Sequence, residues 1–152
     1  MSPKNLFNKS EKEKIIAAIK EAELNTSGEI RVHIETQCQE DPIKRAIEVF
    51  KELKMDKTKL QNGVLIYFAS KDKKLAIIGD KGINDQTPDD YWEINTNNII
   101  SSIKAGSMCE GLCTAIHNIG LKLKKIFPYQ EDDVNELSDD ISFLDNEKKE
   151  KQ

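Results

Sequence analysis

Hydrophobic residues recur at helical spacing in some segments of this chain and at strand spacing in others. Residues 11–25 repeat apolar side chains every three to four positions, which predicts an amphipathic helix. The segment EIRVHIE at 29–35 alternates between apolar and polar side chains, as a strand with one buried face does. A second helix is expected at 42–53, because Asp41 is a good cap and Pro42 fits the first helical position.

The middle of the chain predicts two strands and then two helices. Residues 64–69 are apolar throughout, as in a central strand covered on both faces. A second strand at 75–78 follows after a short basic turn, and so short a link permits an antiparallel hairpin but no parallel crossover. Helical spacing then returns at 88–103 and at 112–126, where the second helix ends before a proline.

This order of elements predicts an α/β fold. A helix between two strands implies a parallel pair joined by a right-handed crossover, and the hairpin adds an antiparallel strand. We therefore expect one domain over residues 1–143, with a small mixed central sheet covered by helices. Residues 144–152 are expected to form a flexible, charged tail.

Composition agrees with a soluble globular domain, since 38% of the residues are hydrophobic and 33% are charged. The longest apolar run is too short to span a bilayer, and no apolar segment follows the first lysine as in a signal peptide. A cytoplasmic location is therefore expected. The three cysteines, Cys38, Cys109 and Cys113, include no C-x-x-C pair, which favours small apolar fillers over a metal or redox site.

Charge is concentrated at the C-terminal end. Residues 129–152 hold nine acidic residues against three lysines, whereas the rest of the chain is nearly neutral. This acidic segment argues against nucleic acid or an anionic membrane as a partner and suits a cation or a basic protein. Its acids are interleaved with apolar residues, so we expect residues 129–143 to pack on the domain through Val134, Leu137, Ile141 and Phe143.

Most familiar catalytic motifs are absent from the sequence. It contains no P-loop, dinucleotide fingerprint, nucleophile elbow or EF-hand loop. The two histidines are far apart, and His33 is expected to be a half-exposed strand residue rather than a catalytic base. The remaining candidates are carboxylate, amide and carbonyl oxygens, which are the ligands that hard cations such as calcium prefer.

Strand directions place several of these oxygens together. If the first two predicted strands are parallel and the third is antiparallel to the second, then Glu29, Asn62 and Asp80 lie at the same edge of the sheet. Two interpretations stay open for Asp80: a metal ligand in a loop that Gly79 and Gly82 allow to curl, or the cap of a turn. Asp89 and Asp90, further along the same loop, are better explained as complements to a helix dipole.

Several segments resemble the TPM domain family of thylakoid-lumen and bacterial envelope proteins. They are TSGEIRVHI, NGVLIYFA, LAIIGDKGI, the following YW, and FPYQEDDVNELSDDISF, which is similar to the soluble, single-domain bacterial branch. The resemblance extends from about Phe7 to Phe143 and implies a three-layer α/β/α sandwich. It also implies calcium binding, which is reported for some members, or the acid-phosphatase activity attributed to plant members. The family's metal-ligand position corresponds to Asp80, and Asp132 with Asp133 is a second source of ligands.

These features support a calcium-binding module that contacts an unidentified protein and carries no catalytic residues. Its expected calcium ligands are Asp80, Asp132, Asp133, Glu29 and Asn62. Two alternatives remain, a metal-dependent hydrolase resembling an acid phosphatase and a metal-free interaction domain. The hydrolase has the weakest support, because the sequence offers no activated nucleophile and Lys81 is the only basic residue in the Asp80 loop.

Overall fold

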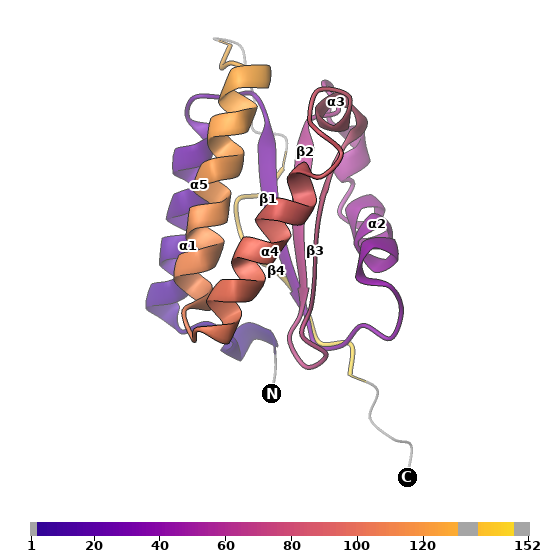
Figure 1. Ribbon diagram of the computed structural model, residues 1–152, viewed down its shortest axis with the longest axis vertical. Helices are drawn as coiled ribbons and strands as arrows, with labels where there is room; N and C mark the ends of the chain where they lie inside the picture. Colours follow the sequence, from indigo (N-terminus) through magenta and orange to yellow (C-terminus); the bar gives the residue numbers. More distant parts are fainter. Residues whose placement is uncertain (1–2, 131–136, 148–152) are drawn as a thin grey trace.

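A mixed sheet of four strands lies between two layers of helices in the computed structural model, which describes residues 3–130 and 137–147 (Figure 1). The strands are β1 (Glu29–Glu35), β2 (Gly63–Ala69), β3 (Lys74–Gly79) and β4 (Ser142–Leu144). Their spatial order is β3-β2-β1-β4. β1 pairs in parallel with both β2 and β4, and β2 forms the expected antiparallel hairpin with β3.

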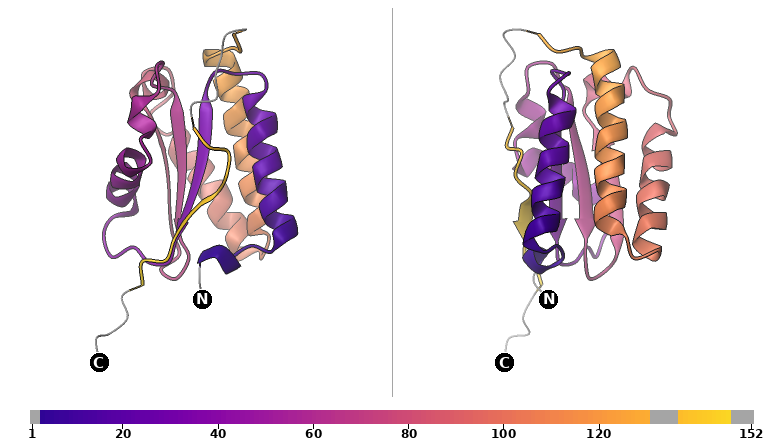
Figure 2. Two further views of the ribbon diagram at one scale, coloured as in Figure 1. Left: turned by 180° about the vertical axis from the view of Figure 1, so that it is seen from behind. Right: turned by 90° about the vertical axis from the view of Figure 1, so that its left-hand side faces the viewer.

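Helices cover the two faces of the sheet unequally. They are α1 (Lys9–Glu23), α2 (Pro42–Glu52), α3 (Lys81–Asn84), α4 (Tyr91–Lys104) and α5 (Met108–Ile126), with short 3-10 turns η1 (Pro3–Asn5) and η2 (Met55–Lys57). One face carries α1, α4 and α5, and the other carries α2 (Figures 1 and 2). The expected three-layer α/β/α sandwich is therefore confirmed. No helix in the described part of the chain is both long and apolar enough to cross a membrane.

The larger core lies between the sheet and the three helices on its first face. The apolar residues of β1 point into it, so the alternating pattern of EIRVHIE marks a strand with one apolar face toward the core, as predicted. Helices α1 and α5 contribute residues at spacings of three and four, among them Ile15, Ile19, Ile116 and Ile119. This core fixes β1, and β1 in turn positions the polar side chains on its opposite face.

The smaller core lies between α2 and the opposite face of the sheet. Ala46, Val49 and Phe50 of α2 pack over Leu65 and Tyr67 of β2. All seven residues of β2 are buried, as expected for a strand covered on both faces. The same face of β1, by contrast, carries polar side chains, because β1 lies toward the edge of the α2 layer. Buried polar groups require partners, and the C-terminal segment supplies several of them.

The C-terminal segment lies along β1. Leu137 packs on the smaller core, and Ile141 and Phe143 pack on the larger one, as expected from the apolar residues interleaved with the acids. Val134, the fourth residue expected to pack, lies outside the described residues. Past β4, Asn146 exchanges hydrogen bonds of 2.8 and 2.9 Å with the backbone of Gln37. The described contacts thus continue beyond residue 143. Hydrophobic pattern did not predict β4, because it is three residues long and lies within an acidic segment.

Candidate functional site

Glu29, Asn62 and Asp80 lie at one edge of the sheet, where β1 and β2 begin and β3 ends. Glu29 is in register with Gly63, and its N–H donates to the Asn62 carbonyl at 3.2 Å. The N–H of Asp80 donates to the Gly63 carbonyl at 2.9 Å. The pairing of the three strands therefore brings together the three segments that the sequence assigned to this edge.

The two carboxylate oxygens of Asp80 have different surroundings. Oδ1 accepts the Lys81 N–H at 2.7 Å and caps the short helix α3. Oδ2 is buried and has no hydrogen-bond partner among the described residues. A buried carboxylate oxygen without a donor is costly, and a cation would satisfy it. The capping role is thus real, but it uses only one of the two oxygens.

Gly79 and Gly82 serve close packing in this loop, which differs from the role expected from the sequence. A Cβ on Gly79 would lie 2.5 Å from the Trp92 ring, and one on Gly82 would lie 2.6 Å from a backbone carbonyl oxygen of residues 60–61. The space that these glycines leave is filled by protein. Asn84 completes the loop, since it donates to the Gly79 carbonyl and accepts the Trp92 indole N–H, each at 2.8 Å.

Glu29 and Asn62 are almost fully buried and already have protein partners. They are 4% and 2% exposed, respectively. The Asn62 amide donates to the Ser27 carbonyl at 2.9 Å, and Glu29 Oε1 accepts the Leu137 N–H at 2.8 Å. Glu29 thereby joins the sheet edge to the C-terminal segment. Asp132 and Asp133, the two further ligands expected from the sequence, lie outside the described residues.

Glu23 is a further acidic residue near this edge, and sequence reasoning missed it. Its Oε2 accepts the Ile30 N–H at 2.9 Å, and its carboxyl group hydrogen-bonds to that of Asp139. Burial, together with the neighbouring Asp139 and Glu29 carboxylates, raises the pKa of Glu23 to about 9. At neutral pH Glu23 therefore keeps its proton. As the last residue of an amphipathic helix, Glu23 gave no signal that it would be half-buried.

The described acidic side chains do not complete a metal site by themselves. Among the residues that the structure describes, no three His, Cys, Asp or Glu side chains form a group that could hold a metal ion. Calcium takes six to eight oxygen ligands, including backbone carbonyls and water. An ion beside Asp80 would therefore need backbone or water oxygens, or acidic side chains from residues 131–136.

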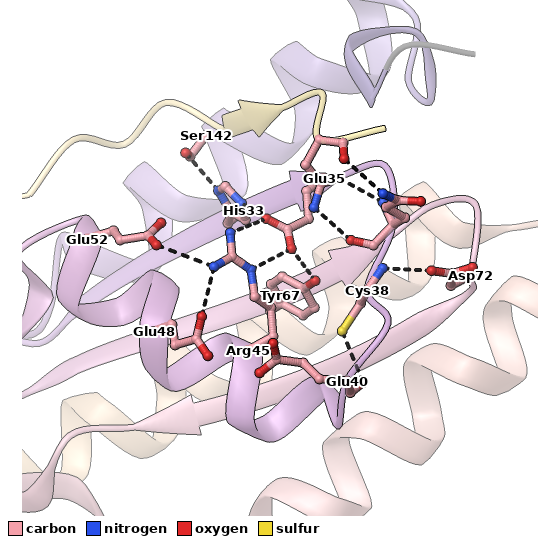
Figure 3. Close-up of polar contacts among 12 residues, drawn as sticks. His33, Glu35, Cys38, Glu40, Arg45, Glu48, Glu52, Tyr67, Asp72 and Ser142 are labelled. Atoms are coloured by element: carbon pink, nitrogen blue, oxygen red, sulfur yellow. Dashed lines mark hydrogen bonds and ion pairs between the residues drawn. The ribbon is translucent and has the colours of Figure 1, made fainter. Parts of the chain in front are cut away.

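A second polar cluster lies at the opposite end of β1, on the face that α2 covers (Figure 3). Glu35, which is fully buried, accepts hydrogen bonds from Arg45 Nε and Nη2 at 2.8 and 3.0 Å. It also accepts the Tyr67 hydroxyl and contacts His33 Nε2 at 2.9 Å. The other imidazole nitrogen, His33 Nδ1, lies 2.9 Å from Ser142 Oγ of β4.

Glu35 is the acceptor at the centre of this cluster. Burial alone would raise its pKa, but hydrogen bonds from His33, Arg45 and Tyr67 outweigh burial and lower the pKa to about 2. Burial and the Glu35 carboxylate conversely raise the pKa of Tyr67, so the phenol keeps its proton. The cluster thus holds one carboxylate ionised and fully hydrogen-bonded inside the protein.

The order Ser142–His33–Glu35 is that of a hydroxyl, an imidazole and a carboxylate, as in nucleophilic hydrolases. Access to substrate is poor, however, because His33 is only 4% exposed and the two surface clefts between α1 and α5 contain none of these residues. These contacts instead hold β4 against β1. The expectation of a half-exposed His33 without partners was wrong. Glu35 lies two residues later on the same strand face, and this spacing could have indicated a partner for His33.

Comparisons with known proteins agree with this fold. The NMR structure of the BA42 protein from the psychrophilic bacterium Bizionia argentinensis is 48% identical, with a TM-score of 0.83 over 91% of this chain and 95% of that one. The N-terminal domain of the cg2496 protein from Corynebacterium glutamicum shares the fold at 14% identity, with a TM-score of 0.60 over 77% and 74% of the two chains.

Family comparison gives a direct assignment. No curated protein matches the chain. The model of the TPM domain matches residues 1–121, which is most of the chain and includes both the β1–β2 edge and the Asp80 loop. The protein therefore belongs to the TPM domain family, as the resemblance of its sequence segments indicated.

Proposed function

We propose that the protein is a calcium-binding module that acts by contacting another protein rather than by catalysis. The observation that supports it most is the buried Asp80 Oδ2, which lacks a hydrogen-bond donor among the described residues. Calcium is a hard cation that prefers carboxylate and carbonyl oxygens, and these are the groups gathered at this edge. A bound ion would neutralise a carboxylate that is otherwise costly to bury.

Several residues would share the ion. Asp80 would supply its second oxygen, and Glu29 and Asn62 belong to the adjoining strand ends. Asp132 and Asp133 would supply the remaining acidic ligands, because the described residues do not complete a site. A site assembled from several chain segments is less preorganised than a dedicated loop, so moderate affinity is expected.

Glu29 would couple calcium binding to the binding of a partner protein. Its carboxylate accepts the Leu137 N–H, so a cation that draws on this carboxylate also changes how the C-terminal segment is held. A metal-free interaction domain is the second candidate, and one observation favours it. Ile43 and Ile47 lie one turn apart on α2 and are both exposed, which is an apolar strip suited to protein contact.

Calcium titration tests the proposal through the single tryptophan. Trp92 is hydrogen-bonded to Asn84 in the loop that follows Asp80, so its fluorescence should report an ion bound there. Asp80→Asn should weaken binding at least about tenfold, equivalent to about 1.4 kcal/mol. The Asp132→Asn, Asp133→Asn double variant should weaken it similarly. Isothermal titration of each protein provides an independent affinity.

A matched control is available in the same loop. Asp89 is exposed, and Asp89→Asn removes the same charge without touching the proposed ligands, so affinity should stay within about twofold of wild type. Equal calcium affinity for wild type and Asp80→Asn would place any site elsewhere. Absence of binding by the wild type would favour the metal-free interaction domain. Ester hydrolysis of about one turnover per second, abolished by Asp80→Ala, would favour the hydrolase.

A further inference from the structure

A cleft between α1 and α5, remote from the sheet edge, is lined in part by sulfur-containing residues. The cleft has a volume of about 500 Å³ and is lined by Met108, Cys109 and Cys113 together with Lys14. A second cleft of about 380 Å³ adjoins it along the same two helices, and Cys113 lines both. Cys109 belongs to the larger core and Cys113 packs against it, as expected of apolar fillers, but Cys113 is only half-buried and faces both clefts.

Helical spacing brings the two thiols together. Cys109 and Cys113 are four residues apart in α5, so their side chains lie on one face of the helix, and the thiols hydrogen-bond to each other. Cys109 Sγ also lies 3.8 Å from the Glu11 carbonyl oxygen. Because metal–thiolate bonds are about 2.3 Å long, two sulfurs in contact need only a small separation to hold one ion between them.

We propose that Cys109, Cys113 and Met108 bind a soft, thiophilic metal ion of the Cu(I) type. Thiolate and thioether sulfur are the ligands that select Cu(I) over hard cations such as calcium. On binding, each thiol releases its proton to solvent and forms one sulfur–copper bond, and the Met108 thioether donates a third electron pair. No electron is transferred, and copper stays Cu(I) throughout.

Charges around the cleft act on the thiols in both directions. Two thiolates on one Cu(I) carry a net negative charge, and the Lys14 ammonium favours the thiolate form of both thiols, whereas the Glu11 and Glu110 carboxylates oppose it at Cys109. The start of α5 adds the positive end of a helix dipole, since Met108 is its first residue. Burial is nevertheless the larger effect, and it raises the pKa of Cys113 to about 11. Without metal the pair is therefore protonated and poorly suited to redox exchange.

Competition for Cu(I) tests the site in the full chain. The protein is titrated anaerobically, with a reductant, against the Cu(I) complex of bathocuproine disulfonate, whose colour reports the copper that remains on the chelator. Wild type should remove one copper per chain and release about two protons per ion, since two thiols are deprotonated. Loss of a group that merely supports a metal ligand costs about 10- to 100-fold in affinity, so Cys113→Ser, which removes a thiolate ligand, should weaken binding at least about 100-fold. Met108→Leu removes the weaker thioether ligand and should weaken binding about tenfold.

Cys38→Ser is the matched control, because Cys38 lies in the smaller core and donates to the Glu40 carbonyl, away from this cleft. It should bind copper like wild type. Cys113 carries the main test because it is less buried than Cys109, and amide NMR spectra confirm that each variant is folded. Failure of wild type to remove copper, an equal loss in Cys38→Ser, or copper-induced dimers would overturn the proposal.

Discussion

Replacing Glu35 by alanine should lower the free energy of unfolding by about 3–5 kcal/mol, the usual cost of removing one partner of a buried ion pair. The substitution leaves the Arg45 guanidinium, the Tyr67 hydroxyl and His33 without their shared acceptor. Urea unfolding followed by Trp92 fluorescence measures the loss. Hydrogen exchange should also show faster opening at Ser142–Leu144, because β4 is linked to Glu35 through His33.

Glu48→Ala is the control for this prediction. Glu48 contacts the same guanidinium at 3.2 Å, but its side chain is 51% exposed, so its removal should cost less than about 1 kcal/mol. If Glu35→Ala cost no more than Glu48→Ala, the buried cluster would contribute little to stability and would not hold the sheet together.

The second large effect is a pH dependence that originates at Glu23. The pKa of Glu23 is about 9 in the folded protein, whereas its ordinary value, which applies to the unfolded chain, is 4.5. Between these pH values the folded chain therefore holds a proton that the unfolded chain has lost. Stability from this group is complete below pH 4.5 and is lost as the pH rises toward 9. The slope is at most about 1.4 kcal/mol per pH unit. Glu35, whose pKa is lowered to about 2, contributes its full stability above pH 4.5 and loses it only as the pH falls from 4.5 toward 2.

Glu23→Gln should remove most of this slope and stabilise the protein at pH 8 by about 1–3 kcal/mol relative to wild type. Glutamine keeps an oxygen to accept the Ile30 N–H and gains an N–H to donate to Asp139. Unfolding curves at pH 5 to 8, in the presence of a calcium chelator, test this. Glu21→Gln on the exposed side of the same helix is the control, and its curve should parallel that of wild type. Parallel curves for Glu23→Gln would contradict the prediction.

Much of the fold could be predicted because its signals are local. The uninterrupted apolar run of β2 and the short turn after it determined a central strand and a hairpin, and helical spacing identified α1 and α5. β4 could not be predicted in this way. Its pairing depends on contacts such as His33 with Ser142, which lie 109 residues apart, and no local pattern records such a contact.

The candidate site likewise has features that local patterns predict and features that depend on distant contacts. Strand direction was sufficient to place Glu29, Asn62 and Asp80 at one edge, because the ends of paired strands must coincide. The pairing of Glu23 with Asp139 was beyond sequence reasoning, since it joins the end of α1 to the C-terminal segment. Side-chain surroundings, such as the single unsatisfied oxygen of Asp80, emerge only from the packed structure.

The late position of β4 in the chain has a consequence for biosynthesis. The ribosome makes His33 and Glu35 more than a hundred residues before Ser142, which closes the outer edge of β1. A nascent chain therefore carries β1 with one edge open and with His33 lacking its serine partner until translation has passed residue 144. Open strand edges invite pairing between neighbouring chains, so nascent copies on one polysome are most exposed to mispairing during this interval.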